Sequence, residues 1–124
     1  MADFEKAFLM ILILPCHRDL LRFFWPEVPG DIKSELVVYK FRVVLFGSIS
    51  SPYLLAAVLE ITIQDDVKDK ALSKILQEGI YVDDLSVVVF RKEILLNLYE
   101  VCKLVFQARH FNLRKWASNC TELN

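Results

Sequence analysis

Two adjacent aspartates, Asp83 and Asp84, lie between two strongly apolar arms, residues 80–83 and 85–90. This pattern predicts a hairpin that carries both acids at its turn. Ionised carboxylates repel each other, and apolar surroundings raise the cost of their charge, whereas a divalent metal reverses that balance. A solvated acidic turn is the alternative. It is the weaker one, because two-residue hairpin turns favour Asn-Gly or Asp-Gly over Asp-Asp.

The rest of the chain alternates between strand and helix patterns. We expect a strand stub at 1–4, a short helix at 5–14 that Pro15 ends, and a hairpin of strands at 20–25 and 37–43, the second half-buried. We expect a helix to start at 50–52, to have a second N-terminal cap at Asp65 and Asp66, and to end with Gly79 as its C-cap. A helix at 94–106 and a closing strand at 111–117 follow. This order predicts an α+β fold in which helices cover one face of an antiparallel sheet.

The length and composition of the chain fit one compact domain over residues 1–124. Hydrophobic residues make up 55% of the chain, enough to bury a core. The longest uncharged apolar run, Phe8 to Leu14, is too short to span a membrane, and no signal-peptide pattern precedes it. We therefore expect no membrane partner.

Charge and cysteine content narrow the expected partners and compartment. The net charge of −1 lacks the basic excess of a nucleic-acid binder, so either the chain does not bind nucleic acid or the phosphate-binding parts lie on other segments. Cys16, Cys102 and Cys120 fit neither a zinc pattern nor a disulfide framework, which favours a reduced, intracellular compartment. His17 and His110 have no partner ligand at helical spacing, and core or surface roles are expected for them.

Four blocks of the sequence resemble, in order, the palm motifs of reverse transcriptases, and more closely those of the BEL/Pao group of long-terminal-repeat retrotransposons. The third block is Tyr-Val-Asp-Asp, an instance of the signature Tyr-x-Asp-Asp. The blocks are Ala-Asp-Phe-Glu-Lys-Ala-Phe at 2–8, Phe-Gly-Ser-Ile-Ser-Ser-Pro-Tyr-Leu-Leu-Ala-Ala at 46–57, Tyr-Val-Asp-Asp at 81–84 and Asn-Leu-Arg-Lys-Trp-Ala-Ser-Asn at 112–119. The resemblance implies a partial polymerase palm that lacks most of the fingers, the thumb, the connection and the ribonuclease H region.

The resemblance also implies a set of catalytic residues. Asp3 and Asp83 would be the principal ligands of two Mg²⁺ ions, with Asp84 beside them and Mn²⁺ as a possible substitute. The reaction would be nucleotidyl transfer from a dNTP to a primer 3′-hydroxyl, with pyrophosphate leaving. Lys115 matches a lysine thought to protonate the pyrophosphate, and a solvated lysine on an edge strand is its alternative.

Further residues match the nucleotide-binding part of the family pattern. Phe8 matches the bulky gate against a ribose 2′-hydroxyl, with a core aromatic as the alternative. Phe46 and Gly47 match the segment under the incoming nucleotide, although Gly47 also suits an ordinary turn. Tyr81 of the third block is a further nucleotide-binding candidate.

For four basic or aromatic residues the sequence does not decide between nucleic-acid contact and a structural role. They are Lys40 and Arg42, which either meet template phosphates or form a solvated face, and Arg114 and Trp116, which either touch the primer backbone or pack.

The resemblance further implies that the parent protein is an RNA-directed DNA polymerase. Its partners would be an RNA or DNA template-primer, dNTP and the rest of the polyprotein, in a cytoplasmic virus-like particle. Leu45, Met10, Val88 and Val89 depart from the family pattern and suggest drift. We expect the isolated fragment to be inactive. The alternative is a non-catalytic remnant that keeps the palm fold or acts only by self-association.

Overall fold

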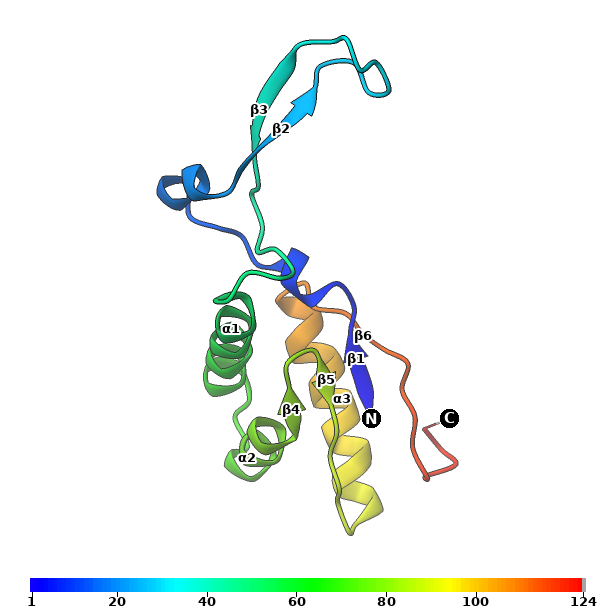
Figure 1. The fold of residues 1–124 in the computed structure, drawn as a ribbon. Coiled ribbons are helices and arrows are strands. Elements are labelled where there is room, and N and C mark those ends of the chain that lie inside the picture. Colours follow the sequence, from blue (N-terminus) through cyan, green and yellow to red (C-terminus); the bar gives the residue numbers. More distant parts are fainter. Residues whose placement is uncertain (124) are drawn as a thin grey trace.

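The computed structural model describes residues 1–123 as an α+β protein with two antiparallel sheets (Figure 1). Helices α1, α2 and α3 gather around the larger sheet, and the smaller sheet extends away from them. The elements in chain order are β1 (Ala2–Phe4), η1 (Ala7–Met10), η2 (Pro15–Leu20), β2 (Arg22–Pro26), β3 (Leu36–Lys40), α1 (Ser51–Asp66), α2 (Lys70–Gly79), β4 (Ile80–Tyr81), β5 (Asp84–Leu85), α3 (Lys92–Ala108) and β6 (Leu113–Arg114).

The larger sheet has the strand order β4-β5-β1-β6, so β1 is a central strand between β5 and β6. Because side chains alternate across a strand, β1 separates its residues between two faces. Ala2 and Phe4 are buried on one face, and the ring of Phe4 meets Phe106 of α3 edge-on at a centroid distance of 4.9 Å. Asp3 lies on the opposite, more open face. The predicted α+β class with an antiparallel sheet is therefore confirmed.

The three helices build the core with apolar side chains at helical spacing. Full burial of one such side chain stabilises the fold by roughly 1.5–3 kcal/mol. The fully or nearly fully buried residues are Leu55, Leu59 and Ile63 of α1, Leu72 and Leu76 of α2, and Leu98, Cys102 and Phe106 of α3. Within residues 1–123 no helix combines the length and apolar content that crossing a membrane requires.

The predicted start of the first long helix is confirmed, whereas its predicted second cap is wrong. Ser50 precedes α1, and a proline lies in its first turn. The cap of α2 is Asp69, whose side chain accepts hydrogen bonds from the backbone N–H groups of Ala71 (2.8 Å) and Leu72 (3.3 Å). Asp66 instead accepts a hydrogen bond from Arg109 at 2.8 Å, so tertiary pairing takes this acid out of the capping role.

Gly79 ends α2 for a reason that differs from the predicted one. It is the last helical residue, and the extended residue Ile80 is the C-cap, so no left-handed glycine cap forms. A Cβ atom at Gly79 would lie 2.4 Å from Val87 Cγ1 and 3.0 Å from the carbonyl oxygen of Ser86. Glycine is needed here for close packing against the segment after β5.

The predicted helix at 5–14 is wrong. Only the short helix η1 forms there, and residues 11–13 then run alongside residues 42–44. Ile13 N–H donates to the Arg42 carbonyl (2.8 Å), and Val44 N–H donates to the Ile11 carbonyl (3.0 Å). β-branched isoleucines suit this extended pairing better than a helix, and the helix η2 occupies the next six residues.

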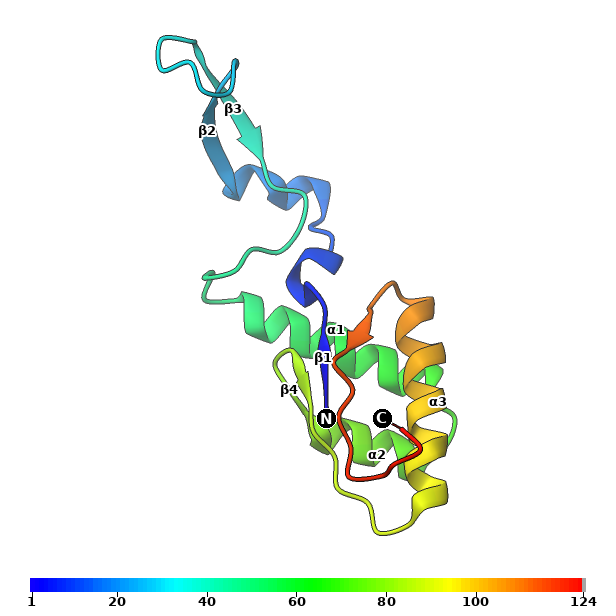
Figure 2. The ribbon, with the colours of Figure 1, turned by 90° about the vertical axis from the view of Figure 1, so that its right-hand side faces the viewer.

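The predicted hairpin of the second and third strands is confirmed, with Phe24 opposite Val38. Its predicted half-burial is wrong, because every residue of β3 is exposed. The hairpin projects away from the helices (Figures 1 and 2), which leaves the side chains of β3 open to solvent. The predicted arms after the acidic turn and at the C-terminal end are also shorter than expected, since β4, β5 and β6 have two residues each.

Candidate functional site

One row of facing residues crosses all four strands of the larger sheet on its open side. Tyr81 faces Asp84, Asp84 faces Asp3, and Asp3 faces Arg114. Directly opposed residues of antiparallel strands present their side chains on the same face. The row therefore collects one aromatic, two acidic and one basic side chain from segments that lie far apart in the sequence.

The pairing of Asp3 with Asp84 is of the type that brings side chains closest together. The Phe4 N–H donates to the Asp83 carbonyl at 2.8 Å, so Asp3 and Asp84 form the neighbouring non-hydrogen-bonded pair. In such pairs the Cα atoms lie about 4.5 Å apart. Two like charges at these positions destabilise the pairing. This arrangement favours a counter-ion, and Asp83, at the turn beside the pair, is a third acid close in the chain.

The turn that holds the acids is strained. Val82 and Asp83 connect β4 to β5, and Val82 has φ 55°. A β-branched residue in this left-handed region is a genuine outlier. Such a conformation costs of order 1–3 kcal/mol and persists where surrounding structure fixes it, often at functional sites. No sequence signal predicted this strain, because valine is a strand-forming residue.

Lys115 reaches the acidic pair from a bulge after β6. Asp3 faces Arg114, while Met1 and Ala117 exchange backbone hydrogen bonds of 2.8 and 3.0 Å. Ala2 is therefore opposed by two residues, Lys115 and Trp116, and Lys115 takes φ 53°. The Lys115 Nζ atom lies 3.2 Å from Asp3 Oδ2. The Lys115 side chain is 80% exposed, so the ion pair contributes at most about 1 kcal/mol.

Arg114, the basic end of the row, is held by Glu5. Its guanidinium forms an ion pair with the Glu5 carboxylate, which also accepts a hydrogen bond from the Asn112 side chain at 2.9 Å. The Asn112 hydrogen bond and the charge of Arg114 hold the pKa of Glu5 below its ordinary value of 4.5. The sequence alone did not predict this cluster, although Glu5, Asn112 and Arg114 fall inside the first and fourth motif blocks.

The predicted nucleotide-binding residues do not all gather at the row. Tyr81 is part of it and is 80% exposed. Phe8 is buried in the core, where its ring meets the exposed Phe46 edge-on at 4.5 Å. Gly47 follows in the loop before α1, with φ 84°. The roles of Phe8, Phe46 and Gly47 toward a nucleotide stay predictions.

Two of the other basic and aromatic candidates, Lys40 and Trp116, have side-chain partners within the chain, whereas the nucleic-acid role of Arg42 stays a prediction. Lys40 forms an ion pair with Asp19, which also binds Arg22 at 2.9 Å. Trp116 packs edge-on against Tyr99 at 4.7 Å and donates its indole N–H to the Leu113 carbonyl at 3.2 Å. Trp116 therefore packs, as one of its two expected roles requires.

The three aspartates have the kind of donor atom that magnesium prefers, and they lie at the sequence positions that the motif blocks predict for its ligands. Their carboxylates are hard oxygen ligands, and magnesium takes one or two such groups together with water and substrate phosphates. Asp3 and Asp84 supply two on facing positions. Across residues 1–123, however, no three acidic, histidine or cysteine side chains form a group that could hold a metal ion. The structure thus pairs Asp3 with Asp84 without gathering all three carboxylates.

Comparisons with known proteins add no family to this description. No family model, no curated protein and no solved structure matches the chain.

Proposed function

We propose that the chain is the palm core of a reverse transcriptase-type polymerase, in which Asp3, Asp83 and Asp84 hold the catalytic magnesium ions. The observation that carries the proposal is the register of β1 against β5, which sets Asp3 opposite Asp84. These acids lie 81 residues apart in the sequence (84 − 3), and only folding brings them together. The resemblance implies that Asp3 acts together with the acidic couplet at 83–84, and the pairing of Asp3 with Asp84 supports the proposal.

Magnesium bound there would neutralise the negative charge that develops on the reacting phosphate. The aspartates would hold the ions and orient the dNTP triphosphate against the primer 3′-hydroxyl. Lys115, beside Asp3, would give a proton to the leaving pyrophosphate. The row is accessible to such substrates, because Tyr81 and Asp84 are exposed on the open face of the sheet.

The net charge of −1 fits a palm whose phosphate-binding surface lies largely on other parts of a polymerase. The template-primer and the dNTP would then be gripped mainly outside this chain. We accordingly propose that residues 1–124 supply the catalytic carboxylates and do not copy a template alone.

Template-primer extension by a longer polypeptide that contains this chain tests the proposal. Asp83→Asn should abolish nucleotide incorporation, because it removes a metal-binding carboxylate while keeping the shape of the side chain. Asp31→Asn, in the loop of the β2–β3 hairpin, is the matched control and should leave incorporation unchanged. Equal incorporation by wild type and Asp83→Asn would refute the assignment of Asp83.

A second candidate is a non-catalytic protein that acts by self-association. The β2–β3 hairpin favours it, since large apolar side chains are exposed there, among them Phe24, Trp25 and Leu36. Exposed apolar patches of this kind mark association sites. Sedimentation of the wild-type and Phe24→Ser proteins at several concentrations tests this function. Self-association requires that the wild type forms an oligomer and that the substitution makes this oligomer dissociate.

A further inference from the structure

Arg114 of β6 has two acidic side chains within reach, and it binds the more distant one. Asp3 lies directly opposite Arg114 in the register of β1 and β6, and cross-strand pairs of opposite charge are favourable. The Arg114 guanidinium nevertheless forms its ion pair with Glu5, two residues further along the chain. In residues 1–123 no ion pair joins Arg114 to Asp3.

A second donor explains why Glu5 is the partner of Arg114. The Asn112 Nδ2 atom donates to Glu5 Oε2 at 2.9 Å, while the Arg114 guanidinium donates to Glu5 Oε1. The side chains of Glu5 and Asp3 are equally exposed, at 30% and 29%, so solvent screening favours neither acid. The longer side chain of Glu5 and the fixed orientation of its carboxylate therefore decide which acid Arg114 binds.

This choice of partner leaves Asp3 with a weak competitor for a cation. The Asp3 carboxylate pairs with Lys115, whose side chain is 80% exposed, and such a pair is worth little. Arg114 would be a stronger competitor, because a guanidinium can bind a carboxylate through two N–H groups at once and keeps its charge at every physiological pH. A divalent cation at Asp3 would have to displace it.

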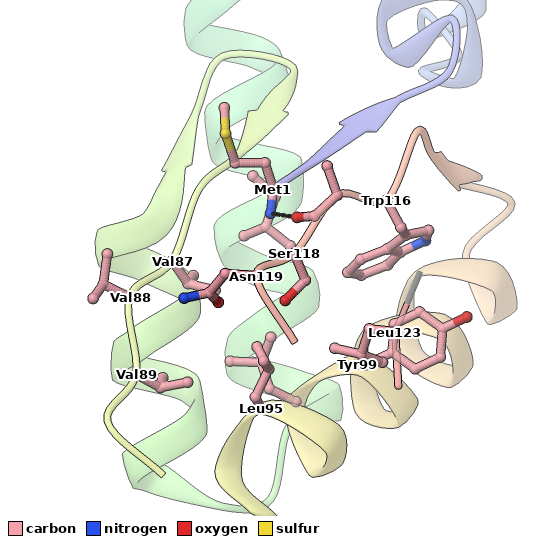
Figure 3. A pocket seen from close by; sticks show the side chains of 13 residues that line it. Met1, Val87, Val88, Val89, Leu95, Tyr99, Trp116, Ser118, Asn119 and Leu123 are labelled. Carbon is pink, nitrogen blue, oxygen red and sulfur yellow. Dashed lines mark hydrogen bonds between the residues drawn. The ribbon is translucent and has the colours of Figure 1, made fainter. Parts of the chain in front are cut away.

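The backbone around Arg114 is held independently of the Glu5 side chain. On one side the Glu5 N–H donates to the Asn112 carbonyl at 2.8 Å. On the other side Met1 and Ala117 exchange hydrogen bonds of 2.8 and 3.0 Å, the first of which Figure 3 shows. Loss of the Glu5 charge should therefore change the partner of Arg114 while the register of the strands stays the same.

We propose that Glu5 is a positioning residue, which holds the Arg114 guanidinium away from Asp3 and so leaves the Asp3–Asp84 pair free to take a divalent cation. This inference rests on the proposed function, because it concerns the metal affinity of the same acidic pair. Glu5 contacts neither the metal nor the substrate in this role. It acts through Arg114, and the two residues must be tested together.

Calorimetric titration of the full chain with Mn²⁺ tests the proposal. Glu5→Gln removes the charge and keeps the shape of the side chain, so Arg114 should turn to Asp3. Mn²⁺ should then bind about three- to fivefold more weakly, as fits competition by an exposed ion pair. In the double variant Glu5→Gln/Arg114→Gln the affinity should return to within about twofold of the wild-type value. Glu100→Gln, an exposed acid on α3, is the control and should bind Mn²⁺ like wild type.

A readout without metal separates a change of partner from a mere change of net charge. Nuclear Overhauser effects in the metal-free chain report which side chain lies beside the δ-protons of Arg114. We expect contacts with the side chain of residue 5 in the wild type and with the side chain of Asp3 in Glu5→Gln. The double variant then shows whether the altered Mn²⁺ affinity depends on this contact.

Two results would overturn the inference. One is an Arg114 side chain that stays beside residue 5 in Glu5→Gln, and the other is a Mn²⁺ affinity that the second substitution does not restore. Failure of the wild type to bind Mn²⁺ would instead refute the proposed metal site, and the metal-free contacts would still decide whether Glu5 keeps Arg114 from Asp3. If the α3 amide signals show that Glu5→Gln does not fold, Asn112→Ala replaces it. That variant changes no charge and should weaken Mn²⁺ binding in the same direction.

Discussion

Asp3 and Asp84 face each other across β1 and β5 as a non-hydrogen-bonded pair, the closest pairing that an antiparallel sheet offers. A sheet that serves only stability would avoid two like charges at these positions. On the other side of Asp3, the Lys115 ammonium group supplies one positive charge. The balance of charge among the pair and its lysine should therefore affect stability and, under the proposed function, the affinity for a divalent metal.

Removing one charge of the pair should stabilise the chain when no metal is present. Asp84→Asn keeps the shape of the side chain and ends the repulsion with Asp3, so we expect the free energy of unfolding to rise by about 0.5 kcal/mol. Denaturant unfolding in a chelating buffer measures it. Glu100→Gln, an exposed acid on α3, is the control and should change stability little. A loss of stability in Asp84→Asn would mean that the two carboxylates do not repel each other.

Lys115 should compete with a divalent cation for Asp3. Lys115→Met removes the competing charge, so we expect Mn²⁺ to bind about two- to fivefold more tightly, as fits an exposed ion pair. Calorimetric titration with Mn²⁺ gives the dissociation constants. Lys70→Met, an exposed lysine at the start of α2, is the matched control. Weaker Mn²⁺ binding by Lys115→Met than by this control would show that the lysine supports the metal site.

Gly79 should not tolerate a side chain. Gly79→Ala places a methyl group 2.4 Å from Val87 Cγ1, and a stiff β-branched neighbour and the Ser86 carbonyl leave little room to move. We expect a loss of about 1–2 kcal/mol in the free energy of unfolding despite the better helix propensity of alanine. Ser73→Ala in the same helix is the control and should be neutral or stabilising. A stabilised Gly79→Ala protein would contradict the close approach.

The cysteines should differ sharply in reactivity. Burial raises the pKa of the Cys102 thiol to about 12, whereas Cys16 is exposed. Since the thiolate is the reactive form, iodoacetamide at pH 8 should modify Cys16 in the folded protein and Cys102 only after unfolding. Mass spectrometry of the digested protein reads out both sites. Equal rates of modification would show that the region around Cys102 opens readily.

The raised pKa of Cys102 also gives stability a defined dependence on alkaline pH. Below pH 9, the ordinary pKa of the thiol, it is protonated in both states, and its contribution to stability is complete. Between pH 9 and about 12 only the unfolded chain loses the proton, so the free energy of unfolding falls as the pH rises. Cys102→Ala should remove this part of the decline, which unfolding measurements across that pH range would show.

The sequence predicted the elements whose signals are local. The proline after Ser50 and Ser51 marked the start of α1, the apolar spacing marked α3, and the apolar arms marked the acidic hairpin. The burial of β3 could not be predicted, because its alternating pattern depends on a covering layer that the described residues do not supply. The prediction of a helix at 5–14 was wrong because residues 11–13 pair with residues 42–44, and this pairing outweighs the local preference for helix.

The candidate site could be predicted only in part, because it also depends on contacts between segments that lie far apart in the sequence. The motif blocks suggested that Asp3 and the acidic couplet meet, and the sheet register bears this out for Asp3 and Asp84. The left-handed Val82 and the bulge at Lys115 arise from how the strands fit together. No pattern within a single segment of the chain encodes them.

The most direct test of the central claim is Mn²⁺ titration observed through the backbone amide signals of the whole chain. Bound Mn²⁺ broadens signals close to it, so a shared site should broaden the amides of residues 2–4 and 83–85 together and at the same Mn²⁺ concentration. Both sets should stay sharp in an Asp3→Asn protein. Broadening at 83–85 with residues 2–4 unaffected, or broadening centred on Asp65 and Asp66, would contradict a metal site shared between β1 and the acidic turn.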